Sequence, residues 1–176
     1  MRMDNETFRL KVENLFSSLR AAGDGFDRAV MAELEQLAVT PRKSRYFLKA
    51  LSQQSDPELQ DHFYRLVLSR VRSDQDASDV ERHIRHMFYT NRDEAKATLA
   101  RIAKRDALPA LFRVIALTEE GWLAGELIRI VLAADPDELH QPLVDALDSK
   151  EYLLQCLAIY LIGKSGDPAL LDALAR

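Results

Sequence analysis

The chain has 176 residues, of which 47% are hydrophobic and 30% are charged, and its formal net charge at pH 7 is −4. This balance is typical of a globular protein long enough to form one domain with a sizeable core. Six glycines and six prolines are few for a β-rich or loop-rich fold, and the abundant leucine, alanine, arginine and glutamate favour helices.

Apolar residues recur at helical spacing over the first ninety residues, and no stretch alternates for long with a period of two. One apolar stripe runs from Phe8 to Leu19, and another runs from Phe26 to Leu37. Thr40-Pro41 and Asp56-Pro57 each join an N-cap residue to a first-turn proline, so each predicts the start of a further helix. We expect helical hairpins throughout this segment.

Capping-box pairs predict the next two helices. Ser78 is followed three residues later by Glu81, and Asn91 is followed by Glu94. In such a pair the first side chain accepts a hydrogen bond from the backbone N–H of the residue three positions later, and the glutamate side chain accepts one from the backbone N–H of the first residue. Because each cap is worth about 1 kcal/mol, we expect helix boundaries at both positions.

Helix boundaries recur at a regular distance in the last seventy or so residues. Asp135 and Asp167 are 32 residues apart, and each precedes a proline; Pro109 and Pro142 are 33 residues apart. A recurring period of this length, with two helices in each unit, indicates a stacked array. The predicted boundaries here are starts near Leu108-Pro109, Glu120, Asp135-Pro136 with Pro142, Lys150 and Asp167-Pro168, and an end at Gly163.

Two predicted helices, Trp122–Ala134 and Tyr152–Ile162, are apolar nearly all round. An ordinary amphipathic helix has a single apolar stripe, so these two are expected to be covered on several sides. A stack in which each inner layer packs between two others provides such cover.

The residues from Cys156 to Leu174 read CLAIYLIGKSGDPALLDAL. This segment resembles the HEAT-like repeats of the phycobilisome-lyase type, in which an Ala- and Leu-rich helix ends in glycine and Gly-Asp-Pro opens a second helix. Residues 135–147 follow the same pattern with two extra residues, and residues 1–90 hardly match it. The resemblance implies an all-α fold, a right-handed α-α superhelix (a HEAT- or armadillo-like solenoid) of about 10–11 helices.

The expected organisation is a single domain over residues 1–176, with divergent helical hairpins in 1–90 and HEAT-like repeats in 91–176. No polar helix caps the last repeat before Arg176, although terminal repeats need one. We therefore expect either that the natural protein continues, with these residues as its N-terminal part, or that this edge self-associates. A short natural end at Arg176 is the remaining interpretation.

The sequence also indicates a compartment. Cys156 is the single cysteine, so no internal disulfide can form, which favours a reducing environment. The first residues are charged and lack the apolar segment of a signal peptide. Apolar stretches near Ile128 and Leu157 are too short to span a bilayer. We expect a cytoplasmic protein without membrane insertion.

Residues that could carry chemistry have simpler explanations. His83 and His86 share a helix face, but the neighbouring Arg82 and Arg85 would repel a cation, so we expect surface histidines and no metal site. Cys156 lies in an apolar run and is expected to be buried, rather than a nucleophile or a chromophore attachment point. Phosphate-loop, nucleophile-elbow and zinc-helix motifs are missing, so we expect no enzyme and no cofactor.

Charge is unevenly distributed: residues 1–40 carry −2, residues 41–105 carry +5 and residues 106–176 carry −7. Seven of the cations lie between Arg82 and Arg105, interleaved with Phe88 and Tyr89. An ordinary solvated face, a surface for an acidic protein partner and a nucleic-acid surface are three explanations, in that order of preference.

Trp122 is the most informative aromatic residue. HEAT-like alkylpurine DNA glycosylases use a tryptophan, an acid and an arginine in a groove, and Trp122, Glu126 and Arg129 are a set of that kind. The acidity of residues 106–176 would repel DNA, however. We therefore expect Trp122 to be a packing residue or a binding anchor.

These observations predict a non-catalytic scaffold, a regulatory or assembly module that presents a curved helical surface to another protein. Nucleic acid is a less expected partner. The alternatives from another class are a nucleic-acid-binding or DNA glycosylase-like HEAT protein and a lyase-type accessory enzyme. The candidate partner-binding residues are Tyr64, Arg65, Arg82, Arg85, Tyr89, Arg92, Arg113, Trp122 and His140.

Overall fold

A computed structural model describes residues 3–21, 26–40 and 42–174, and this part of the chain contains eleven helices and no strand. The prediction of an all-α fold is therefore confirmed. The helices are α1 (Asn5–Ala21), α2 (Arg28–Ala38), α3 (Ser44–Leu51), α4 (Pro57–Ser69), α5 (Asp74–Thr90), α6 (Arg92–Ile102), α7 (Leu108–Leu117), α8 (Gly121–Leu132), α9 (Pro136–Leu147), α10 (Tyr152–Ser165) and α11 (Pro168–Leu174).

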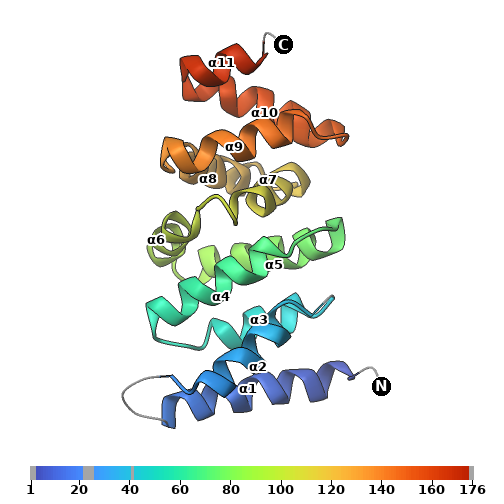
Figure 1. The fold of residues 1–176 in the computed structure, drawn as a ribbon, viewed down its shortest axis with the longest axis vertical. Coiled ribbons are helices and arrows are strands. Elements are labelled where there is room, and N and C mark those ends of the chain that lie inside the picture. Colours follow the sequence, from blue (N-terminus) through green and yellow to red (C-terminus); the bar gives the residue numbers. More distant parts are fainter. Residues whose placement is uncertain (1–2, 22–25, 41, 175–176) are drawn as a thin grey trace.

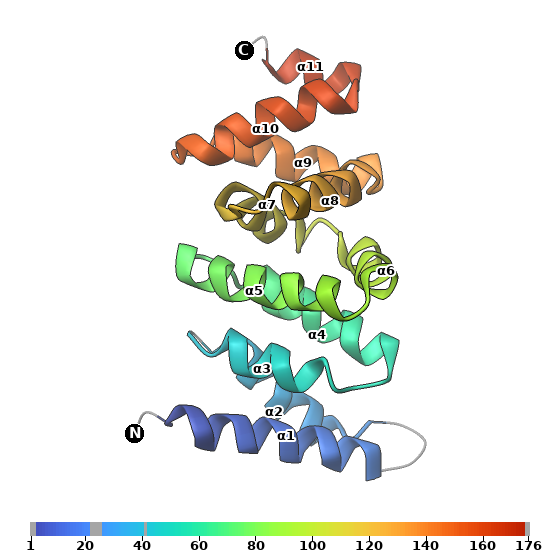
Figure 2. The same ribbon diagram turned by 180° about the vertical axis from the view of Figure 1, so that it is seen from behind.

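The helices are arranged as five successive pairs followed by α11. Within the pairs, α1 packs on α2, α3 on α4, α5 on α6, α7 on α8, and α9 on α10. Each helix also packs on the helix two positions further along, so odd helices contact odd helices and even helices contact even helices. The pairs follow one another along the long axis, with the two termini at opposite ends (Figure 1). Figure 2 shows α1, α3 and α5 lying one above the other.

A continuous apolar core runs through the stack. Near the N-terminal end, Phe16, Phe47 and Phe63 come from α1, α3 and α4, and all three are fully buried. Their ring centroids lie 5.4 to 5.6 Å apart at tilted or edge-to-face angles, the geometry that aromatic rings prefer. These rings join the first two helix pairs.

Several predicted helix starts are confirmed by the hydrogen bonds of their caps. The Asp56 carboxylate accepts from the backbone N–H of Glu58 at 2.9 Å, and Pro57 occupies the first turn of α4. Asn91, Asp135 and Asp167 accept equivalent bonds at 2.9 to 3.2 Å at the starts of α6, α9 and α11. Each cap satisfies a backbone donor that the helix itself leaves unpaired.

Two predicted starts are wrong. Ser78 lies inside α5, whose N-cap is Ser73; the Ser73 hydroxyl oxygen accepts from the backbone N–H of Asp76 at 3.2 Å. Thr40 lies just after α2, and its hydroxyl donates back to the Gln36 carbonyl at 3.1 Å. The next helix begins at Ser44, and Pro41 lies outside the described residues.

The glycine and proline positions near the C-terminus also need correction. Gly163 lies inside α10, which ends two residues later, and Gly166 then adopts the left-handed conformation with φ 65°. Pro142 lies inside α9, so its offset from Pro109, in the first turn of α7, does not join equivalent positions. The other offset does, because Asp135 and Asp167 both cap odd helices.

Helix α10 carries a buried apolar stripe and an exposed one. Leu154, Ala158, Leu161 and Ile162 are buried, whereas Tyr152, Leu153, Ile159 and Tyr160 are 49 to 75% exposed. Cys156 shares the exposed stripe, so the prediction of a buried cysteine is wrong. The expectation of cover on several sides is also wrong for α10. Its apolar composition reflects two separate faces, and its neighbours in the described chain cover one of them.

None of the described helices has both the length and the hydropathy that a membrane crossing requires.

Candidate functional site

Most of the arginines proposed above as partner-binding residues form ion pairs with the next part of the stack. Arg65, Arg85, Arg92 and Arg113 each pair with a carboxylate that follows 34 to 41 residues later in the chain. That separation is about one helix pair, so these bridges tie successive pairs together. Because the bridges engage their guanidinium groups, these four arginines are less free to bind a partner than the sequence suggests.

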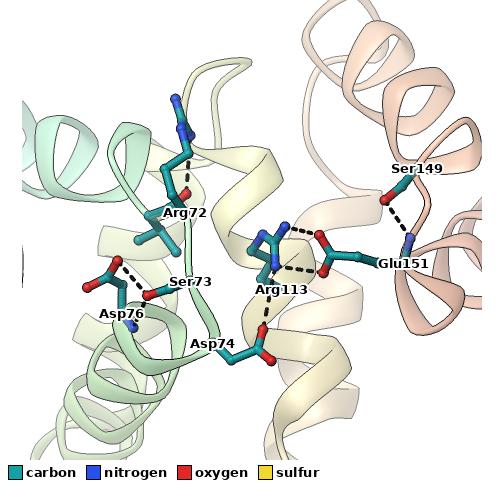
Figure 3. Close-up of polar contacts among 8 residues, drawn as sticks. Arg72, Ser73, Asp74, Asp76, Arg113, Ser149 and Glu151 are labelled. Carbon is teal, nitrogen blue, oxygen red and sulfur yellow. Dashed lines mark hydrogen bonds and ion pairs between the residues drawn. The ribbon is translucent and has the colours of Figure 1, made fainter.

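Arg113 is the clearest example (Figure 3). It lies on α7 with its side chain only 20% exposed, between Asp74 at the start of α5 and Glu151 just before α10. Its Nη1 is 2.8 Å from Glu151 Oε2 and 3.5 Å from Asp74 Oδ1, and its Nη2 bonds the other oxygen of Glu151. This fork joins three helix pairs.

Glu126 on α8 forms ion pairs with three cations. Arg92 Nη2 lies 2.5 Å from Oε1, Lys96 Nζ lies 3.1 Å from Oε2, and Arg129 Nη1 lies 3.1 Å from Oε1. The hydrogen bond from Arg92 is the main reason why the pKa of this carboxyl is lowered from its ordinary value. Only 5% of the Glu126 side chain is exposed. The arrangement favours a structural role for Glu126 between α6 and α8 over that of a general base.

We expect Glu126→Gln to lower the free energy of unfolding by about 1–2 kcal/mol, because the neutral amide weakens the charge-assisted bonds to its three cations. The loss is no larger because the three cations are exposed and can be hydrated. The folded-state pKa is lowered, so the wild-type contribution is present above the ordinary carboxyl pKa and is lost as the pH falls through the folded value. Urea unfolding at neutral and acidic pH measures both effects. Glu119→Gln, at an exposed position nearby, is the control; equal losses in the two variants would contradict this assignment.

An aromatic cluster brings together three of the predicted residues, Arg85, Tyr89 and Trp122. The Tyr89 and Trp122 ring centroids are 5.5 Å apart, and the Trp122 indole N–H donates to Glu120 Oε2 at 2.5 Å. Arg85 Nη1 lies 2.7 Å from the other Glu120 oxygen. This last bond, together with that of Trp122, lowers the pKa of Glu120. Tyr89 is 70% exposed and Trp122 39%, so the cluster has an accessible face.

Tyr64 and His83 are less accessible than the sequence suggests. Tyr64 is 5% exposed, and its Oη lies 3.1 Å from His83 Nε2. Burial raises the pKa of Tyr64, and burial followed by the nearby His86 lowers the pKa of His83 to about 4. The prediction that both histidines are surface residues therefore holds only for His86, since His83 is partly buried. His140, another predicted residue, is half-buried on α9.

Arg82 is different, because it lines a pocket of about 370 Å³ between α3 and α5. The lining residues fall on one stripe of each helix, at the i, i+3, i+4 and i+7 spacing that places side chains on a single face. They are Arg45, Lys49, Ser52 and Gln53 from α3 and its C-terminal end, and Asp79, Arg82, His83 and His86 from α5.

This basic pocket contains cations that no carboxylate neutralises. Arg45, Lys49 and Arg82 are exposed, and none of them forms an ion pair with a residue that the structure describes. Asp79 is the one carboxylate in the lining, and it accepts a 3.4 Å hydrogen bond from Gln75. Three permanent positive charges therefore face one negative charge.

The sequence-based prediction did not include Arg45 and Lys49, because cations are denser between Arg82 and Arg105 than around these two residues. A signal was present: the two cations are four residues apart in one short helix, on the same face. A second pocket, of about 150 Å³, shares Ser52 and His86 with the basic pocket, so the two adjoin.

Within the described ranges, no group of three or more His, Cys, Asp or Glu side chains is placed to hold a metal ion. Comparisons of the chain with protein-family models, with curated proteins and with solved structures found no match.

Proposed function

We propose that this chain is a HEAT-like helical-repeat module, a right-handed α-α superhelix, that binds another protein through the basic pocket between α3 and α5. The observation that carries the proposal is the contrast in charge pairing. Arg65, Arg85, Arg92 and Arg113 are engaged by carboxylates that follow 34 to 41 residues later, whereas Arg45, Lys49 and Arg82 surround one pocket without forming an ion pair with a described residue.

The packing supports a repeat architecture. The first helices of the five pairs and α11 begin 28 to 39 residues apart, at Asn5, Ser44, Asp74, Leu108, Pro136 and Pro168. Odd helices pack on odd helices and even on even, and interhelical ion pairs recur at about the same separation. Repeat proteins of this kind present long preformed surfaces.

The pocket supports binding. Lysine and arginine keep their charge at physiological pH, and they are held on packed helices, so an anionic group meets a surface that needs little ordering. A protein partner fits better than nucleic acid. Nucleic acid needs a continuous basic stripe, and the formal charge of −7 over residues 106–176 would repel its phosphates. A reducing, cytoplasmic setting suits the single exposed cysteine.

The test is affinity capture with the full chain, comparing the wild type with the triple variant Arg45→Glu, Lys49→Glu, Arg82→Glu. The matched control reverses three exposed cations outside the pocket: Arg28, Arg70 and Lys150. We expect the wild type and the control to capture the same protein and the pocket variant to lose it, with equal helicity by circular dichroism. Capture of that protein by all three at the same level would contradict the proposal.

We further propose that the exposed stripe of α10 mediates self-association. It presents Tyr152, Leu153, Ile159 and Tyr160, and apolar surface of this kind is removed from water when two copies meet. Light scattering of the wild type should give an average mass that rises with concentration. Leu153→Asp combined with Ile159→Asp should hold the mass at that of one chain. A wild type that stays monomeric at every concentration would rule the proposal out.

A further inference from the structure

The basic pocket carries more positive charge than one carboxylate group of a ligand would neutralise. Arg45, Lys49 and Arg82 approach it from two helices, and Asp79 offsets one of their three charges. A surplus of about two positive charges matches a phosphate monoester, which carries about −1.5 to −2 at pH 7. We propose that the pocket binds the phosphate group of a phosphorylated serine or threonine in a protein partner. This inference rests on the proposed function and names the group that the site recognises.

The types of side chain fit a phosphate. Arg45 and Arg82 come from different helices, and each guanidinium offers a planar fork that bonds two phosphate oxygens at once. Lys49, one turn after Arg45, adds a point charge, and the Gln53 side-chain amide adds a neutral donor at the end of α3. A tetrahedral group with three terminal oxygens can accept from several of these donors together.

The histidines set the limits of the pocket. His83 lines it but is partly buried against the Tyr64 hydroxyl, 3.1 Å away, so it forms an uncharged wall. His86 is exposed and lies between the basic pocket and the adjoining pocket of about 150 Å³. The adjoining pocket offers mainly uncharged side chains, among them Gln60, Met87, Thr90 and Thr98, with Glu94 as its carboxylate. It provides space for a residue that flanks the phosphorylated one.

The clustering of three cations without an ion pair at one pocket favours a phosphoprotein over a nucleic acid. A polyanion gains affinity by neutralising many phosphates along a basic path. Here the cations that would extend such a path are already paired: Arg85 with Glu120 and Arg92 with Glu126. One concentrated site suits a single phosphorylated side chain.

The experiment measures fluorescence anisotropy of the full chain with labelled pools of short peptides. Each pool has a fixed central residue and degenerate flanks, and the central residue is phosphoserine, serine or glutamate; single-stranded RNA is a fourth probe. Since the phosphate group can accept charge-assisted bonds from both arginines and from Lys49, we expect phosphoserine to bind about tenfold more tightly than serine or glutamate. The triple pocket variant should lose this preference, and the control reversing Arg28, Arg70 and Lys150 should keep it.

Arg82→Gln provides the same comparison with a single exposed substitution, should the triple variant fold poorly; it should weaken phosphoserine binding and leave serine binding unchanged. Equal binding of the three peptide pools would overturn the proposal, and so would tighter binding of RNA than of phosphoserine. Capture of a protein partner that persists after phosphatase treatment, and still requires the pocket cations, would overturn the phosphate assignment while supporting the proposed function. Phosphatase-sensitive capture would support both.

Discussion

Phe63→Ala should lower the free energy of unfolding by about 3–5 kcal/mol, the usual range for removing a fully buried phenylalanine ring. Phe63 is 0% exposed, and its ring packs against Phe16 of α1 and Phe47 of α3 at centroid distances of 5.6 and 5.4 Å. Alanine would leave a cavity where the first two helix pairs meet. The surrounding helices can close it only in part, because the rings and backbones around it are themselves packed.

Urea unfolding followed by circular dichroism measures this loss, and hydrogen exchange locates it. We expect exchange to accelerate first in α1 to α4, because each helix packs mainly on near neighbours in the stack. Phe26→Ala removes a ring that is 45% exposed and should change stability by less than about 0.5 kcal/mol. A loss below about 1 kcal/mol for Phe63→Ala would contradict the packing of this core.

The second large effect concerns His83. Its folded-state pKa is lowered from 6.5 to about 4 by burial and then by the nearby His86, so the unfolded chain binds a proton in a pH range where the folded chain does not. Stability from this group is therefore complete above the unfolded pKa and is lost as the pH falls from about 6.5 to about 4. Once the pH is below both pKa values, the expected loss is about 3–4 kcal/mol, because each pH unit between them contributes about 1.4 kcal/mol.

Unfolding free energies measured over a series of pH values check this prediction. His83→Gln and His83→Asn cannot take up the proton, so their stability should vary less than that of the wild type between pH 6.5 and 4. Carboxyl groups whose protonation also changes stability at acidic pH, such as Glu126 with its lowered pKa, contribute equally to wild type and variants and cancel in the difference. Parallel pH profiles for wild type and variants would disprove the assignment.

The sequence predicted the helices well, because their determinants are local. Asp56 before Pro57, Asn91 before Glu94 and Asp135 before Pro136 each bring a cap within three residues of the donor that it satisfies, and all three are confirmed. Ser78 failed because Ser73, five residues earlier, already caps the same helix. More than one polar residue near this helix start can act as an N-cap, and the local sequence pattern does not show which of them does.

Burial and charge pairing were predicted less well, because they depend on residues far apart in the chain. The apolar run around Cys156 contains two stripes, and only the packing of neighbouring helices decides which one faces the core. Arg85 and Arg92 looked free in sequence, yet their carboxylates lie 35 and 34 residues away. The sequence does contain opposite charges at these two separations, but the pattern of neighbouring residues does not show that they meet.

The basic pocket depends both on local sequence pattern and on contacts between residues far apart in the chain. Each of its stripes is visible in the sequence, as Arg45 with Lys49 and as Asp79, Arg82, His83 and His86. That the two stripes meet follows only from the packing of α3 on α5. The pocket therefore exists only where successive helix pairs stack, so a ligand that binds there also tests the packing of α3 on α5.

Phosphate binding at the basic pocket can be measured by titrating the nitrogen-15-labelled chain with inorganic phosphate, or with chloride at equal ionic strength, and following the amide chemical shifts. We expect saturable, phosphate-specific shifts confined to residues 45–53 and 79–86, two segments brought together only by the packing of α3 on α5. Shifts equal to those with chloride, or scattered over helices outside the pocket, would contradict binding at this pocket.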